Sequence, residues 1–323
     1  MKKTHSIIQI YNQYLPLITG ILFIFLLLTN PINSGFLVNT GLTTWYQHMI
    51  PSLFPFMVLS GVLLRSGLSR QLSSLVNPVF GKIFRLSPDC IYVIIMGFLC
   101  GFPMGASIVA DSLSLKKITN REAGLLLAFC NNIGPIYFLS FAATVCPYYP
   151  IYITMPIMYG VPFIYGLILR YTTFRDIPKY SSHTKNNFVF SDVHASNYLT
   201  AFEESIKKAL ISIITLGGYM IIFNVLQLPL YNSYYQLPDT LLCIFKGLIE
   251  INSGISAIAA FPHLYTIVYS LFLPFGGLCC IFQTYAMIKD THLSLCFYLF
   301  HKIVQTLGTV LLYVVVSFAL TAL

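Results

Sequence analysis

Nine apolar runs follow one another along this chain, and most are long enough to cross a lipid bilayer. A spanning helix needs about 20 mostly apolar residues, whereas soluble domains carry charge on about a quarter of their residues. Here 9% of the 323 residues are charged and 57% are hydrophobic. The sequence therefore predicts an all-α integral membrane protein. The runs cover residues 15–30, 48–64, 91–112, 122–145, 150–169, 209–227, 240–260, 264–288 and 294–320.

The basic residues are concentrated in a few of the connections between these runs. The stretch 65–90 contains four Lys or Arg residues, and the stretch 113–121 contains three. Cytoplasmic connections are the basic ones, so a full span over 91–112 would leave one strongly basic flank outside. We therefore expect 91–112 to be a re-entrant hairpin that enters from the cytoplasm and turns at GFPMG, residues 101–105. The connections without Lys or Arg are 31–47, 146–149, 228–239 and 261–263.

A second hairpin is predicted over 240–260, because neither connection that flanks it is basic and it must enter from outside. It turns at EINSG, residues 250–254. With seven full spans and two hairpins, 16 of the 18 Lys and Arg residues lie on the cytoplasmic side. The exceptions are Lys246, inside the second hairpin, and Lys302, one turn into the last span. This layout predicts a multi-pass protein of the cell membrane with a cytoplasmic N-terminus.

The layout contains an internal repeat of opposite orientation. Residues 48–170 run in the order span, hairpin, broken span, span, and residues 209–323 run in the same order with the sign inverted. Both broken spans place a Gly five residues after a Phe, in AFCNNIGP and in LFLPFGG. The domain organisation is then an N-terminal span with its external connection over 1–47, two inverted repeats, and a cytoplasmic linker over 171–208.

Inverted repeats with re-entrant or broken helices are typical of secondary transporters. Irregular backbone at membrane depth is tolerated only where protein or a water-filled cavity surrounds it. We therefore expect the breaks to meet in the interior around a substrate site, with the lipid bilayer as the surrounding medium. One repeat, or its hairpin, would then move against the other.

Lys246 and Glu250 are the two charges placed most clearly at membrane depth. A central charge costs about 2.5–3.5 kcal/mol to insert unless it is paired or functional. The two residues are four apart on a helix and could neutralise each other as a structural ion pair. Alternatively, Lys246 faces an anionic substrate, and Glu250 carries a proton or coordinates a cation. The sequence leaves both interpretations open.

The first broken span offers polar candidates. Asn131 and Asn132 precede Gly134 and Pro135 in mid-span, and a capping Asn followed by Pro is a plausible restart of a helix. The positive end of that half-helix would favour a carboxylate. Alternatively, the asparagines only satisfy backbone groups freed by the break. The remaining substrate-binding candidates lie at the other breaks: Gly101, Pro103, Gly105, Asn252, Ser253, Gly254 and Gln283.

Other kinds of chemistry find little support in the sequence. The eight cysteines form no CxxC pair, the seven histidines form no HxxxH or HExxH pattern, and no phosphate-binding loop is present. No nucleophile and base can be placed at a shared depth. The net charge of +8 is accounted for by membrane topology, so nucleic acid is not expected as a partner. We therefore expect no enzyme activity, metal site or cofactor.

The ordered motifs GFPMGA, REAGLLLAFCNNIGP, GLIEINSG and LPFGGLCCIFQ resemble those of the sporulation integral membrane proteins of the YlbJ/SpoVV type. That family belongs to the wider group with nucleoside-recognition "gate" repeats, which also occur in nucleoside permeases and ferrous-iron transporters. The resemblance covers roughly residues 48–310. Its glycine and proline motif falls on Gly101, Pro103 and Gly105, its Asn pair on Asn131 and Asn132, and its Glu motif on Glu250 and Gly254.

The resemblance implies a role in spore cortex formation at the outer forespore membrane. It also implies transport of dipicolinic acid from the mother cell toward the spore, a dianionic aromatic substrate. Two alternatives stay open: a non-transporting membrane scaffold of the sporulation machinery, and a nucleoside-type permease. A homodimer or association with other sporulation membrane proteins also stays open.

Overall fold

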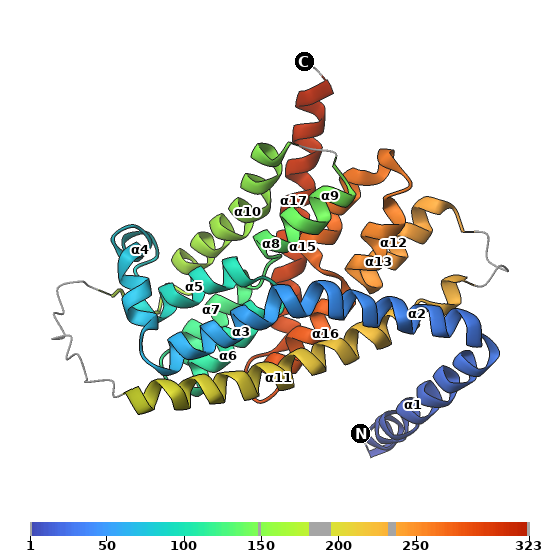
Figure 1. The fold of residues 1–323 in the computed structure, drawn as a ribbon, viewed down its shortest axis with the longest axis horizontal. Helices are drawn as coiled ribbons and strands as arrows, with labels where there is room; N and C mark the ends of the chain where they lie inside the picture. The colour runs from blue at the N-terminus through green and yellow to red at the C-terminus, as the bar shows by residue number, and fades with distance from the viewer. Residues whose placement is uncertain (1, 148–149, 181–194, 232–236, 322–323) are drawn as a thin grey trace.

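The structure is a computed structural model that describes residues 2–147, 150–180, 195–231 and 237–321. Every element in these residues is helical (Figure 1), as the apolar runs predict. Five helices within them are long and apolar enough to cross a membrane, which supports the expected multi-pass protein. They are Pro31–Arg65, Ile151–Tyr171, Tyr198–Tyr231, Pro262–Ile288 and Leu295–Phe318.

The N-terminal part differs from the sequence-based expectation. Helix α1 spans Lys2–Thr29, and its apolar portion, Leu17–Thr29, is shorter than a full span. The stretch 31–47, expected to be an external connection, is instead helical: α2 (Pro31–Thr44) continues through a π-helical stretch (Trp45–Met49) into α3 (Ile50–Arg65). The hydroxyls of Ser34, Thr40 and Thr44 donate to carbonyls four residues earlier, at 2.6–2.9 Å. The hydroxyl groups therefore find hydrogen-bond acceptors within the helix itself. A polar stretch that was expected to be a loop is for this reason stable as a helix.

The first long helices of the two halves pack against each other in antiparallel fashion. Helix α11 (Ala195–Val225) lies along α2 and α3 (Figure 1). A methyl group added to Gly41 would lie 3.0 Å from Cα of Ile221, and one added to Gly61 would lie 2.8 Å from the hydroxyl of Ser205. Helix α11 already begins inside the predicted linker 171–208, of which residues 181–194 lie outside the described residues.

The first hairpin forms at the predicted residues. Helix α4 (Ser69–Phe84) is followed, at an angle of 99°, by α5 (Pro88–Cys100). Ser87 caps the start of α5, and Pro88 occupies its first position, where no N–H is needed. Gly101 ends α5 with a φ of +84°, a conformation that favours glycine. Helix α6 (Met104–Ser114) then packs back against α5.

The first broken span also forms as predicted. Helix α7 (Asn120–Phe129) begins with a reciprocal cap between Thr119 and Glu122 and ends before the two asparagines. The chain resumes as a helical segment over Pro135–Val145, made of α8 (Pro135–Tyr137), a π-helical stretch (Phe138–Ala142) and α9 (Ala143–Val145). Helix α10 (Ile151–Tyr171) completes the first half.

The second half repeats this order of elements. After α11 and a short 3₁₀ turn (Leu228–Tyr231), α12 (Asp239–Ile249) and α13 (Ile251–Ile258) form a hairpin that breaks at Glu250. A 3₁₀ turn (Pro262–Leu264), α14 (Tyr265–Ile267), a π-helical stretch (Val268–Phe272) and α15 (Leu273–Phe275) lead to the break at Gly276. Helices α16 (Gly277–Ile288) and α17 (Leu295–Thr321) follow. The inverted orientation of the whole repeat stays a prediction.

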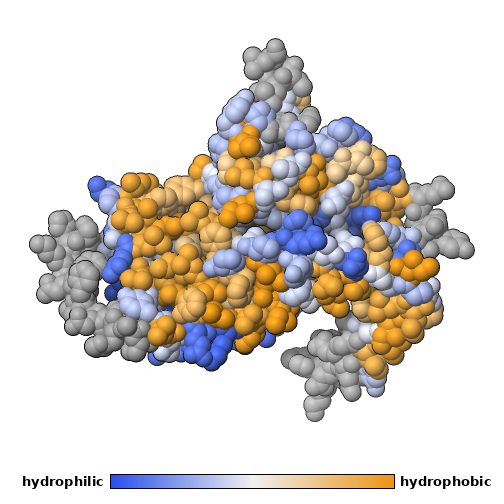
Figure 2. Space-filling view, in the orientation of Figure 1, coloured by the Kyte–Doolittle hydropathy of each residue, from blue (hydrophilic) through white to orange (hydrophobic). Residues whose placement is uncertain are grey.

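Apolar and charged surfaces are separated. Apolar side chains cover much of the visible face, over α3, α11 and the described side chains of α1 (Figure 2). The basic connections lie together at one end of the bundle, as the topology argument requires. Lys117 donates to the carbonyl of Leu64, and burial lowers the pKa of its ammonium. The ion pairs found at this end in the described residues are Arg65–Glu204, Arg70–Asp89, Arg121–Asp176, Glu203–Lys207 and Lys208–Asp111.

Candidate functional site

The four helix breaks meet in the middle of the molecule. A methyl group on Gly101 would lie 2.5 Å from the backbone nitrogen of Gly134, so the two breaks of the first half touch through their backbones. A methyl group on Gly276 would lie 3.1 Å from the Phe102 ring, which connects the two halves. A methyl group on Gly277 would lie 3.0 Å from the carbonyl oxygen of Gly247 in the second hairpin. The expectation that the breaks share the interior is thus met.

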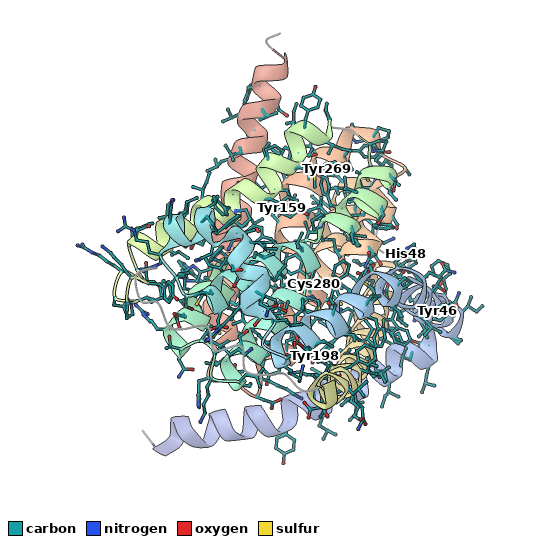
Figure 3. All side chains as sticks on the ribbon, turned by 60° about the vertical axis from the view of Figure 1, so that its left-hand side comes forward. Tyr46, His48, Tyr159, Tyr198, Tyr269 and Cys280 are labelled. Atoms are coloured by element: carbon teal, nitrogen blue, oxygen red, sulfur yellow. The ribbon has the colours of Figure 1, made fainter. Side chains whose placement is uncertain are left out.

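A small cavity of about 40 Å³ lies at this junction. Its wall is formed by all four breaks together with the start of α3 and Met220 near the C-terminal end of α11. Figure 3 places Cys280, one of its lining residues, near the centre of the helical body. The lining residues that belong to the breaks are Cys100, Gly101, Phe102, Ile133, Gly134, Tyr137, Glu250, Ile251, Asn252, Cys279, Cys280 and Gln283.

Three helical N-termini face this cavity. They belong to the segment Pro135–Val145, to α13 and to α16, whose first turns contribute lining residues. A helix N-terminus carries roughly half a positive charge and unpaired N–H groups. Side chains do not cap the first and third of these ends, while the second is capped by Glu250. The two uncapped ends therefore favour an anion at this wall, while the end of α13 is occupied by the Glu250 carboxylate.

Glu250 is a buried carboxylate in the cavity wall, with 2% of its surface exposed. Its oxygens accept hydrogen bonds from the backbone N–H groups of Asn252 and Ser253, at 3.1 and 2.8 Å, and from the Asn252 amide at 2.6 Å. Tyr137, from the first half, donates to the Asn252 amide oxygen at 2.6 Å. Ser253 donates to Asn224 on α11 at 2.8 Å. A polar chain thus joins Glu250 to both halves.

Asn131 connects three helices. Its amide oxygen accepts from the backbone N–H of Ala106 at 3.3 Å, which caps the start of α6. Its amide nitrogen donates to the hydroxyls of Thr284 and Tyr298, at 2.9 and 3.0 Å. Asn132 instead donates to the carbonyl of Phe129 at 2.6 Å and so satisfies the end of its own helix. Neither asparagine caps the helix that restarts at Pro135, because its N-cap is Gly134 and no side chain bonds there. Asn132 satisfies a backbone group freed by the break, as the alternative interpretation expects, and Asn131 caps α6.

Lys302 is the buried cation next to this site. Its ammonium donates to the Asn131 carbonyl at 2.9 Å and to the Asn132 amide oxygen at 3.0 Å, and it lies 4.4 Å from the centre of the Phe102 ring. Only 2% of the residue is exposed. A cation near the C-terminus of a half-helix offsets the negative end of its dipole. Lys302 therefore balances α7 from the opposite half of the protein.

Lys246 does not lie at the cavity. Its ammonium is 4.3 Å from the centre of the Tyr231 ring, and the residue is half-buried. No salt bridge joins it to Glu250 in the part of the chain that the structure describes. The two charges four residues apart point to different surroundings, because Glu250 leaves the helix to cap α13.

The other predicted residues divide into lining and packing positions. Gly101, Gly134, Asn252 and Gln283 line the cavity. Gly105 packs against the carbonyl of Cys130, and Gly254 packs against the backbone of Gly247. Pro103 precedes α6, and Ser253 bonds to Asn224.

The polar face of the last helix was missed as part of the site. His301, Lys302, Gln305, Thr306 and Thr309 are all buried, and Gln305 donates to the carbonyl of Ala128 at 2.5 Å. Their spacing of one, four, five and eight places them on one side of an apolar helix. Polar residues inside a spanning helix mark an interior face, so this pattern could have identified them.

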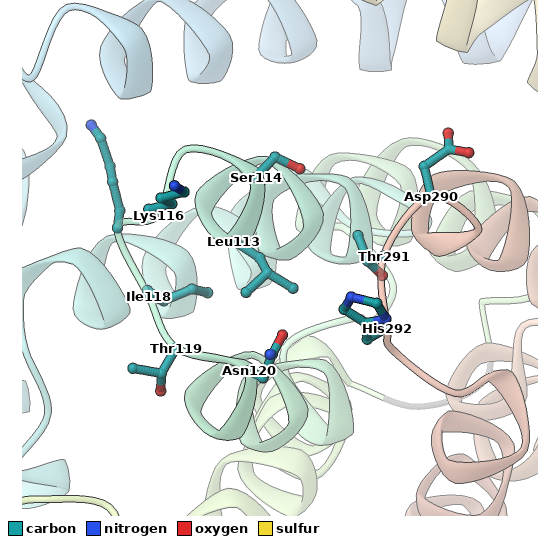
Figure 4. A pocket seen from close by; sticks show the side chains of 10 residues that line it. Leu113, Ser114, Lys116, Ile118, Thr119, Asn120, Asp290, Thr291 and His292 are labelled. Atoms are coloured by element: carbon teal, nitrogen blue, oxygen red, sulfur yellow. The ribbon is translucent and has the colours of Figure 1, made fainter.

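A larger hollow of about 610 Å³ lies at the charged end, between the α6–α7 connection and the α16–α17 connection (Figure 4). Lys116, Asn120 and His292 are among the residues that border it. A group of three or more His, Cys, Asp or Glu residues arranged to hold a metal is absent from the described residues.

Comparison with known proteins adds a family to this geometry. Residues 47–166 match the family model described as "Gate: Nucleoside recognition". This stretch is therefore similar to a Gate domain. The sporulation integral membrane protein YlbJ of Bacillus subtilis (strain 168) is 34% identical over 99 residues, which are 31% of this chain and 24% of that relative. The match therefore covers about a quarter of the relative's length. No solved structure matches the chain.

These matches support the resemblance to the YlbJ type. The Gate stretch includes the breaks at Gly101 and at Gly134. It ends before α11, so Glu250 and Lys302 lie outside it.

Proposed function

We propose that this protein is a secondary transporter of a small organic anion rather than an enzyme or a scaffold. The observation that carries the proposal is the cavity at the meeting point of four helix breaks, faced by three helical N-termini. Such ends bind carboxylates and phosphates, and broken helices at a midplane site are typical of transporters. The aromatic rings of Phe102 and Tyr137 suit a flat organic substrate.

The proposed substrate is dipicolinate, moved from the mother cell toward the forespore across the outer forespore membrane. The relative's name places that protein in sporulation, and the resemblance to the YlbJ/SpoVV type suggests a need for this protein in spore cortex formation. Ligand sites for small molecules measure about 300–1,000 Å³. The present cavity of about 40 Å³ must therefore open to admit dipicolinate, as alternating access requires.

A nucleoside is the second candidate substrate, because the matching family model is described as nucleoside recognition. A nucleoside is uncharged, so it would not use the positive ends of the half-helices in the same way. We therefore favour the anion.

The test is uptake by liposomes that contain the purified full-length chain, with labelled dipicolinate and labelled uridine offered separately. We expect uptake of dipicolinate and none of uridine. Lys302→Met should lower dipicolinate uptake at least about tenfold, since it removes the buried charge beside the cavity. Lys246→Met is the matched control and should transport like the wild type. Uptake of uridine alone would favour the nucleoside permease, and uptake of neither by correctly inserted protein would favour the scaffold.

A further inference from the structure

The N-terminus of α13 already holds a carboxylate of the protein itself. The N–H groups of Asn252 and Ser253 and the Asn252 amide all donate to Glu250. These donors are the ones that an incoming anion would use at this wall of the cavity. Two carboxylates that share such a site cannot both stay ionised without strong repulsion.

Within the described residues, Glu250 forms no ion pair with a cationic side chain. The ion pairs found there all lie at the charged end of the bundle. Lys246, one turn earlier on α12, is turned toward Tyr231, and Lys302 is bound to Asn131 and Asn132. The titratable groups that interact with Glu250 are ordinarily neutral ones, Tyr137, Cys279 and Cys280, while Asp239 is exposed at the far end of α12.

We propose that Glu250 is a proton-binding site that couples anion transport to proton transport. On one side of the membrane, a Glu250 oxygen takes a proton from water, and the neutral carboxyl releases the donors at the start of α13. A carboxylate of the substrate then accepts these N–H groups in its place. On the other side the substrate leaves, the proton returns to water, and Glu250 caps α13 again. One proton therefore crosses in the same direction as each substrate molecule.

This proposal rests on the proposed function and names its driving ion. It also explains why the cap is built from Glu rather than from Ser, Thr or Asn, which satisfy helix ends without a charge. A charged cap at membrane depth is costly. A Glu cap at this position is reasonable if a proton neutralises its charge in every transport cycle.

The experiment uses liposomes that contain the full-length chain and a trapped pH-sensitive dye, with dipicolinate as the probe. For the wild type, we expect the interior to acidify as dipicolinate enters, and uptake to slow by up to about tenfold per pH unit above the titration of Glu250. Glu250→Gln mimics the protonated side chain. Its exchange of internal for external dipicolinate should persist, lose its pH dependence and move no protons.

Asp239→Asn is the matched control, since Asp239 is an exposed carboxylate on the same hairpin, and it should behave like the wild type. Because the substrate is the same in every variant, its own protonation cannot produce a difference between them. Wild-type uptake without acidification would overturn the proton coupling while leaving the proposed function intact. So would a folded Glu250→Gln protein that keeps the wild-type pH dependence or exchanges no dipicolinate. Absence of wild-type uptake under every gradient would overturn both.

Discussion

The closest backbone approach near the site is between Gly247 on α12 and Gly254 on α13, and it allows a sharp test. A methyl group on Gly254 would lie 2.1 Å from Cα of Gly247 and 2.6 Å from its backbone nitrogen. Carbon atoms pack at about 3.5–4.0 Å, so Gly254→Ala requires the two helices to separate by roughly 1.5 Å. Overpacking costs about 1–3 kcal/mol. Because backbone atoms cannot rotate away, we expect Gly254→Ala to lower the free energy of unfolding by about 3 kcal/mol, the upper end of this range.

Two other glycines provide the comparison. Gly218 lies exposed on α11, and a methyl group added there would have nothing within 4 Å, so Gly218→Ala should stabilise by about 0.4–1 kcal/mol through the unfolded chain. Gly247→Ala meets the end of the Phe272 ring at 2.1 Å. A side chain can shift where backbone cannot, so its cost should fall between the other two.

The assay is thermal unfolding of the three variants in lipid nanodiscs, read by circular dichroism. A loss of about 3 kcal/mol should lower Tm by roughly 6 °C for Gly254→Ala. The same variant should impair transport, because Gly254 bonds to the carbonyl of Glu250, one turn earlier, at 3.1 Å. Equal stability of Gly254→Ala and Gly218→Ala would show that the packing of α12 on α13 is wrong.

Three further predictions concern the central junction and the topology. Asn131→Ala removes hydrogen bonds to Thr284, to Tyr298 and to the start of α6. It should lower the free energy of unfolding by about 3 kcal/mol in the same assay, and a change under about 1 kcal/mol would contradict this network. Lys208→Met breaks a partly exposed ion pair with Asp111 and should lower the free energy of unfolding by less than about 1 kcal/mol. In chemical unfolding, high salt should abolish the difference between this variant and the wild type. A larger loss that does not depend on salt would contradict this estimate. In a Cys296→Ser background, an impermeant thiol reagent should label His263→Cys on intact cells and Lys116→Cys only after permeabilisation; labelling of both only after permeabilisation would contradict the second hairpin.

Much of the fold could be predicted because the breaks are encoded locally. Gly101, the Asn131–Gly134 segment, Glu250 and Gly276 are positions where residue type alone disrupts a spanning helix. The breaks at all four positions are confirmed. The connection over 31–47 could not be predicted as helix, because its hydroxyl side chains bond to their own backbone. Composition alone does not distinguish that arrangement from a polar loop.

The position of the cavity was predicted better than the position of the lysine beside it. Residues at the breaks do line one cavity, including Gly101, Gly134, Glu250, Asn252 and Gln283. The cation beside it is Lys302 rather than Lys246. Both lysines are exceptions to the predicted cytoplasmic distribution of basic residues, and only Lys246 was expected to share a helix with Glu250. Which lysine faces the interior depends on packing between helices of different halves, and no local spacing records it.

The contacts between the halves suggest how the cavity could open. Among the polar contacts that join the halves, five lie next to the cavity: Asn131 with Thr284 and with Tyr298, Lys302 with Asn131 and with Asn132, and Tyr137 with Asn252. At about 1 kcal/mol net for each, their loss costs roughly 5 kcal/mol. A state of that free energy is populated rarely but is accessible, and a ligand that binds only the open state can stabilise it. An anion that accepts the N–H groups of Asn252 and Ser253 in place of Glu250, and that draws on the charge of Lys302, offers that differential binding. Asn252 and Lys302 both stand at the contacts that must separate.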